Sequence, residues 1–128
     1  MSFEEAEILK ERAEAFLTNS ERLIGEGFFD LAAFSLEQYC QLMLKYKLLL
    51  KTGTYPRMHL LTRLLRQLSK IAPNVSPLLE KEDSILLLTK LEDAYIGARY
   101  LPRRYQEVEV KALLRFVKEV FKPIIDGV

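Results

Sequence analysis

Residues 28–51 read FFDLAAFSLEQYCQLMLKYKLLLK and are apolar around a wide arc when placed on a helix. The apolar side chains form two flanks, with Leu31, Phe34, Leu42 and Leu49 on one and Ala33, Leu36, Cys40, Met43 and Leu50 on the other. A helix with two apolar flanks has to be covered on two sides. This segment is therefore predicted to be the central helix of the fold.

The rest of the chain also follows the helical period of three and four residues. A first helix is predicted to about Glu26, opened by a capping box of Ser2 and Glu5, and a third over residues 58–71. A fourth is predicted over residues 83–100, capped by Asp83-Ser84, and a fifth from about residue 108, bent or ended before Pro123. No segment alternates with period two. The predicted fold is an all-α, up-and-down bundle of about five helices, with residues 1–128 as one domain.

Composition excludes several classes of site. The chain has 128 residues, of which 49% are apolar and 29% charged, a balance that supports a packed core. One cysteine, Cys40, and one histidine, His59, allow neither an intramolecular disulfide nor a usual zinc site, and no metal or cofactor is expected. The five glycines form no phosphate-cradling motif. The acidic N-terminus and the lack of a long apolar run predict a cytoplasmic protein without a membrane helix.

Charge is distributed unevenly along the chain, although the net charge is only +1. Residues 1–30 carry eight carboxylates against three cations, whereas residues 38–79 contain no Asp or Glu. The cations of this acid-free run are Lys45, Lys47, Lys51, Arg57, Arg63, Arg66 and Lys70. Such a run indicates an anionic ligand.

The polar residues of the central segment form the first candidate site. Gln38, Gln41 and Lys45 are three and four residues apart, so they leave the helix on one side, where a groove is expected. His59 stands where a Gly/Pro loop meets the third helix and is a candidate to face this stripe. Two plainer readings stay open: the stripe as a solvated helix edge, and His59 as a helix-terminal residue with a local hydrogen bond.

The second candidate site is residues 99–105, RYLPRRY, at the end of the fourth helix. Arginine offers a rigid fork to phosphate oxygens, and tyrosine offers a face on which a base can stack. Arg99, Tyr100, Arg103 and Tyr105 are therefore candidate nucleotide-binding residues. The alternative is that these cations only complement the helix dipole.

These segments together resemble the HEPN domain family of small helical bundles. The resemblance rests on residues 28–34 (FFDLAAF), the helix from Gln38 to Leu50, the pair His59-Leu60 and the pair Arg99-Tyr100. It implies nucleotide or RNA binding, a homodimer, and a partner of the nucleotidyltransferase type in toxin–antitoxin-like pairs.

The chain departs from the family pattern in two places. The resemblance implies that catalytically active members of the family are ribonucleases, which use an arginine followed at a short fixed interval by a histidine. In this chain the arginine before His59 is Arg57, which is too close to fit that motif. The family's acidic position in the second helix corresponds to Gln41 here. The sequence therefore favours binding without catalysis.

Three functions follow as hypotheses. In the first, a non-catalytic module binds a nucleotide or RNA. Its phosphate is neutralised by Lys45, Arg99 and Arg103, its base stacks on Tyr100 or Tyr105, and Gln38 and His59 form hydrogen bonds to the base edge or ribose. In the second, a ribonuclease toxin brings its arginine and histidine together through space or across a dimer. In the third, the chain is a scaffold for dimerisation or partner binding.

Overall fold

The computed structural model describes residues 3–128 as helices joined by short loops. In chain order the elements are α1 (Phe3–Gly25), α2 (Phe29–Thr52), α3 (Leu61–Ile71), η1 (Pro73–Val75), α4 (Pro77–Glu80), α5 (Glu82–Tyr100), α6 (Glu107–Phe116), η2 (Val117–Phe121) and α7 (Lys122–Asp126). The described residues contain no strand, which confirms the predicted all-α class. Ser2, half of the predicted capping box, lies outside the described residues.

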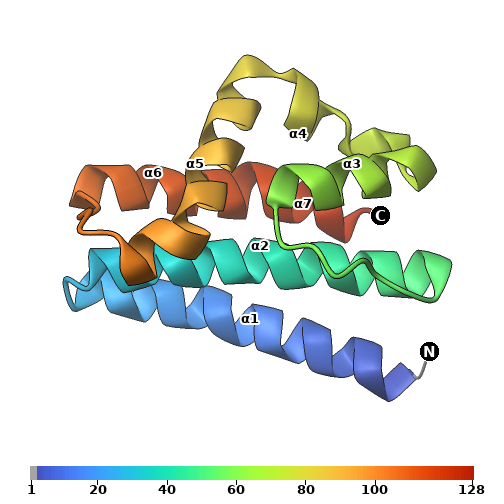
Figure 1. The fold of residues 1–128 in the computed structure, drawn as a ribbon, viewed down its shortest axis with the longest axis horizontal. Helices are drawn as coiled ribbons and strands as arrows, with labels where there is room; N and C mark the ends of the chain where they lie inside the picture. Colours follow the sequence, from blue (N-terminus) through green and yellow to red (C-terminus); the bar gives the residue numbers. More distant parts are fainter. Residues whose placement is uncertain (1–2) are drawn as a thin grey trace.

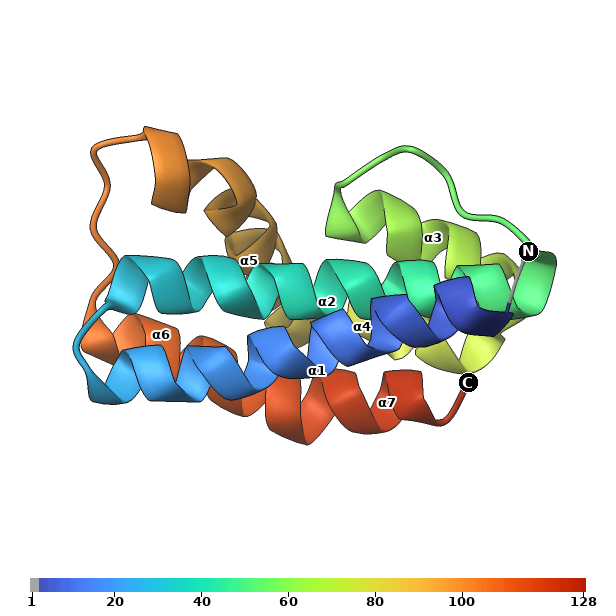
Figure 2. The same cartoon turned by 90° about the horizontal axis from the view of Figure 1, so that it is seen from below.

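Helix α2 is the central helix, as predicted, and packs against α1, α3, α5, α6 and α7. Helix α1 lies antiparallel along one side of α2 (Figure 1). The continuous stretch of α6, η2 and α7 lies along another side of α2. Helices α3 and α5 cover a further side, with α5 over the N-terminal half of α2 and α3 over the C-terminal half (Figure 2). Helix α5 crosses α2 steeply, so this part departs from a simple up-and-down arrangement (Figure 1).

The apolar arc of α2 supplies much of the core. Ala33, Leu36, Cys40 and Leu44 have no solvent exposure. Full burial of one leucine side chain contributes about 2 kcal/mol to folding. Leu31 is 49% exposed, so the buried part of the apolar arc is narrower in the first turn of the helix than further along it.

Glycines lie at the ends of α1 and α2. Gly27 and Gly53 have φ angles of +82° and +87°, in the left-handed region that favours glycine. The N–H of Gly53 donates to the carbonyl of Leu49 and so caps α2. The chain then turns back over α2 through residues 53–60.

Helix α3 begins later than predicted, at Leu61 rather than Met58. Leu60 is extended and has no capping side chain of its own, so the first amides of the helix need another acceptor. Glu92 of α5 supplies it, because its Oε2 accepts hydrogen bonds from the N–H and the hydroxyl of Thr62 at 2.9 and 2.7 Å. This carboxylate fixes α3 to α5 and leaves His59 in the loop.

The predicted cap of the fourth helix is wrong, because α5 begins at Glu82 and its N-cap is Lys81. Asp83 and Ser84 therefore lie inside the first turn. The proline-containing break before it is itself folded into η1 and α4, whose first residues are Pro73 and Pro77. Proline suits the first turn of a helix because the N–H groups of that turn have no acceptor within the helix, so the N–H that proline lacks is not missed.

The C-terminal helix is neither ended nor broken at Pro123. Its α-helical part, α6, passes into the π-helical turn η2, in which the N–H of Lys122 donates to the carbonyl of Val117. Proline inside an α-helix removes one hydrogen bond and clashes with the carbonyl four residues earlier. The wider π turn lies where this clash is expected, and α7 continues beyond it.

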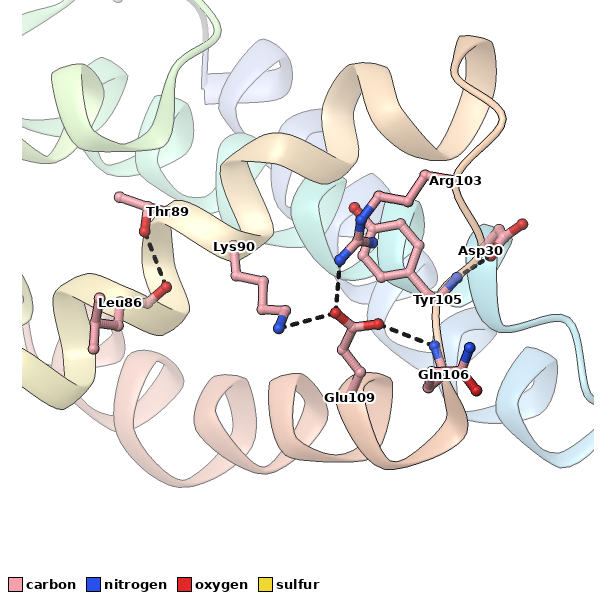
Figure 3. Close-up of polar contacts among 8 residues, drawn as sticks. All are labelled: Asp30, Leu86, Thr89, Lys90, Arg103, Tyr105, Gln106 and Glu109. Atoms are coloured by element: carbon pink, nitrogen blue, oxygen red, sulfur yellow. Dashed lines mark hydrogen bonds and ion pairs between the residues drawn. The ribbon is translucent and has the colours of Figure 1, made fainter.

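Glu109 fixes the corner between α5 and α6 (Figure 3). Its Oε2 accepts from Lys90 at 2.9 Å and from Arg103 at 2.7 Å, and its Oε1 accepts from the N–H of Gln106 at 3.0 Å. Burial alone raises the pKa of Glu109, but the hydrogen bonds from Lys90, Gln106 and Arg103 outweigh it and lower the pKa to about 2.

We expect Glu109→Gln to lower the free energy of unfolding at pH 7 by about 2 kcal/mol, after allowing for solvent screening of the two cations. The folded pKa lies below the ordinary value of 4.5, so this stabilisation is present above pH 4.5 and is lost as the pH falls through about 2. Urea unfolding at pH 7 and pH 2.5 measures the difference.

The matched control is Glu107→Gln, half a turn earlier on α6. Among residues 3–128, Glu107 pairs only with Lys111, and both side chains are at least half exposed. We expect its effect to stay within about 0.5 kcal/mol at both pH values. Equal losses for the two variants would show that Glu109 does not fix the corner.

Candidate functional site

A buried carboxyl group, Glu37, lies on the polar side of α2. Its side chain has no solvent exposure. One oxygen accepts a hydrogen bond from the amide of Gln38 and the other from the amide of Gln41, each at 2.8 Å. Burial of a carboxylate is costly unless its oxygens are satisfied. Here neutral amides satisfy them, and no ion pair involves Glu37 among residues 3–128.

Lys45 continues the same row one turn further along α2. Its ammonium donates to Oε1 of Gln41 at 3.2 Å and lies 3.2 Å from Nδ1 of His59. Nδ1 of His59 also lies 3.3 Å from Oε1 of Gln41, so the imidazole contacts both Lys45 and Gln41. Lys45 is 7% exposed, whereas His59 lies at the surface. The row therefore leads from the core to the solvent.

Tyr95 of α5 joins His59 to Arg99. The rings of Tyr95 and His59 are stacked, with centroids 5.5 Å apart and an interplanar angle of 19°. The guanidinium of Arg99 lies 4.6 Å from the Tyr95 centroid and 4.8 Å from those of Phe34 and Tyr100. Its Nε donates to the carbonyl of Tyr95 at 2.8 Å. Arg99 is thus held by aromatic faces and a carbonyl.

Burial sets the protonation of this cluster. It raises the pKa of Glu37 to about 7, against the opposing effects of the hydrogen bonds from Gln38 and Gln41 and of the charges of Arg99 and Lys45. Burial also lowers the pKa of Lys45, against the opposing charge of Glu37. Glu37 is therefore partly protonated near neutral pH, and its charge only partly offsets the two cations.

The structure brings five of the eight predicted residues together: Gln38, Gln41, Lys45, His59 and Arg99. We call these five residues with Glu37 and Tyr95 the Glu37 cluster. Tyr100 borders the cluster through Arg99 and is 71% exposed. The open groove expected on α2 is absent at Gln41, which is only 4% exposed, because the loop carrying His59 covers this side.

Arg103 and Tyr105 lie apart from the cluster, at the corner between α5 and α6 (Figure 3). Arg103 pairs with Glu109 and lies 3.9 Å from the centroid of the Tyr105 ring. Tyr105 is 3% exposed, and its N–H donates to Asp30 at 2.7 Å. Both residues therefore have structural roles at this corner.

Sequence reasoning missed Glu37 and Tyr95. Glu37 directly precedes the acid-free run and stands four residues before Gln41 and eight before Lys45, so the helical period places all three on one side. This spacing was sufficient to find it. Glu37 lies one turn before Gln41, the position that the resemblance assigns to the family's acidic residue. Nothing in the sequence signals that Tyr95 lies against His59.

A family model described as HEPN domain matches residues 6–127. The chain belongs to the HEPN domain family. No curated protein and no solved structure matches it significantly. In the described part of this HEPN domain, no helix has the length and hydropathy needed to span a bilayer, and no group of three His, Cys, Asp or Glu side chains is placed to hold a metal ion.

We expect the stability of the HEPN domain to fall by about 3 kcal/mol as the pH rises from 4.5 to above 7, as far as Glu37 contributes. The folded pKa, about 7, exceeds the ordinary value of 4.5, so the folded state binds more protons in this window. Glu37→Gln, which cannot ionise, is expected to lack this part of the slope. Urea unfolding at several pH values from 4.5 to 8 measures it.

Glu11→Gln, at an exposed position of α1, is the matched control. We expect its stability to follow the same pH dependence as the parent protein. If Glu37→Gln also retains the parent slope, Glu37 titrates at its ordinary pKa and is not the protonatable centre of the cluster.

Proposed function

We propose that this HEPN domain is a nucleotide- or RNA-binding module without catalytic activity, which receives phosphate at the exposed edge of the Glu37 cluster. His59 and Arg99 form this edge, and both contact Tyr95. Lys45 lies beneath it, at 3.2 Å from His59. Arg103 and Tyr105 are left out of the proposed site because they belong to the corner at Glu109.

The observation that carries the proposal is that Lys45 and Arg99 contact uncharged groups rather than carboxylates. Lys45 contacts an amide and an imidazole, and Arg99 contacts a carbonyl and three rings. Neither forms an ion pair with a carboxylate of the described residues. The exposed guanidinium of Arg99 is available to phosphate oxygens because it has no carboxylate partner, and the buried ammonium of Lys45 adds positive potential beneath it.

We expect Arg99→Ala to weaken the binding of a labelled single-stranded RNA octamer about tenfold or more, since a charge-assisted hydrogen bond contributes about 1.5–3 kcal/mol. Loss of one phosphate contact should also reduce the slope of log K against log salt by about 0.7, the value for a single strand. Fluorescence anisotropy at several salt concentrations measures both quantities.

Arg115→Ala removes an exposed arginine of α6 and is the control for nonspecific charge loss. It is expected to change the affinity less than twofold. The proposal fails if the parent protein binds neither the octamer nor ATP, or if the two arginine variants bind alike.

One observation favours a second candidate function, an RNA-cleaving enzyme. His59 and Arg99 come from different segments, yet both lie against the Tyr95 ring. In such a reaction the ribose 2′-oxygen attacks phosphorus and the 5′-oxygen leaves. Histidine takes the proton from the 2′-hydroxyl, and arginine stabilises the charge on the phosphate.

A cleavage assay separates the two functions. We expect purified parent protein to leave a labelled RNA octamer intact while binding it. Cleavage that disappears in both His59→Ala and Arg99→Ala would assign the enzymatic function instead. Cleavage that persists in both variants would come from another part of the protein or from a contaminant.

A further inference from the structure

Within the Glu37 cluster itself, the Tyr95 ring is occupied, because it contacts both Arg99 and His59. The ring of Tyr105 is buried. Tyr100, which borders the cluster, carries the guanidinium of Arg99 on its ring and is 71% exposed. A base whose phosphate binds at the Glu37 cluster can therefore stack only on Tyr100 or on a ring outside the cluster, among the described residues.

A hollow of about 480 Å³ lies next to the cluster, between the end of α2, the loop 53–60 and α3. Its lining is mainly apolar and includes the ring of Tyr55 and the adjacent Pro56. Thr54 and Gln67 bring groups that donate or accept hydrogen bonds, and Lys70 brings a cation. An apolar hollow of this size with a few polar groups is typical of a small-molecule site.

Every residue that lines this hollow falls between positions 48 and 71, inside the run without Asp or Glu. Arg63, Arg66 and Lys70 form a row of exposed cations on α3. Arg66 lies three residues and Lys70 seven residues after Arg63, so the three side chains leave the helix on one side. None of these three forms an ion pair within residues 3–128. The surroundings of the hollow therefore attract an anion, and no carboxylate of its lining repels one.

Lys45 connects the hollow to the Glu37 cluster. Its ammonium lies 5.7 Å from the centroid of the Tyr55 ring and 3.2 Å from His59. One buried cation thus contacts both the aromatic wall of the hollow and the proposed phosphate site.

We propose that this hollow is a nucleobase site, in which a base stacks on Tyr55, Gln67 and Thr54 form hydrogen bonds to its edge, and Lys70 contacts a neighbouring phosphate. The proposal rests on the proposed nucleotide or RNA binding and names the aromatic contact that the Glu37 cluster lacks. Stacking tolerates any base because every base has a π face, so a modest sequence preference is expected.

The test compares Tyr55→Leu, which removes the ring and keeps an apolar side chain, with Tyr55→Phe, which keeps the ring. Loss of one stacked base should weaken binding of a labelled RNA octamer about tenfold or more in Tyr55→Leu, with Tyr55→Phe within about twofold of the parent. Circular dichroism melts check that both variants fold. Lys70→Gln should weaken binding. Lys81→Gln, at an exposed lysine that does not line the hollow, should leave binding unchanged.

Photocrosslinking locates the base directly. An octamer with one 4-thiouridine is irradiated on the parent protein, and the crosslinked peptide is identified by mass spectrometry. Crosslinks within residues 54–71 support the nucleobase site, and crosslinks confined to residues 95–105 overturn it. AMP added as competitor distinguishes a site for a single nucleotide, where it displaces the octamer, from a site for one base of a longer strand.

The variants also separate this inference from the proposed function. Weaker binding in Arg99→Ala together with unchanged binding in Tyr55→Leu overturns the nucleobase site and leaves the phosphate site. The reverse pattern places binding in the hollow and removes the Glu37 cluster from it. Absence of any binding by the parent protein overturns both.

Discussion

The burial of one carboxyl group, Glu37, in the central helix is the constraint on which the polar side of this structure depends. Water cannot reach it, so neighbouring side chains have to satisfy its two oxygens. The amides of Gln38 and Gln41 do so. Gln41 then uses its own oxygen to accept from Lys45. Glu37, Gln41 and Lys45, four residues apart, thus form a row along the central helix in which each buried polar group has a hydrogen-bond partner.

This row requires a cover that is itself partly polar, and the chain supplies it from two segments. The chain is not helical from residue 53 to residue 60, and Glu92 of α5 caps α3 at Thr62, so His59 stays in the loop and contacts Lys45. The steep crossing of α5 brings Tyr95 against His59. The late start of α3, which the sequence did not predict, is therefore one of the features that build the Glu37 cluster.

The sequence predicted what depends on local pattern. The helical period located α1 and α2, and the spacing of Gln38, Gln41 and Lys45 placed them together. Contacts between distant segments were not predictable in this way: Glu92 caps α3 from 30 residues away, and Glu109 of α6 pairs with Lys90 of α5. Such partners follow from the packing angle of α5, for which one sequence without its structure carries no signal. The π turn before Pro123 is likewise a compromise between continuing a helix and avoiding a clash.

Cations gather at two places that differ in their electrostatics. In the Glu37 cluster, Lys45 and Arg99 surround a buried acid whose pKa of about 7 makes the net charge of the cluster depend on pH near neutrality. Along α3, Arg63, Arg66 and Lys70 are exposed and form no ion pair among the described residues. Attraction of an anion by α3 is therefore easily screened by salt. Attraction by the cluster is less screened and strengthens when Glu37 takes up a proton. A ligand that spans both would be drawn in by the first and held by the second.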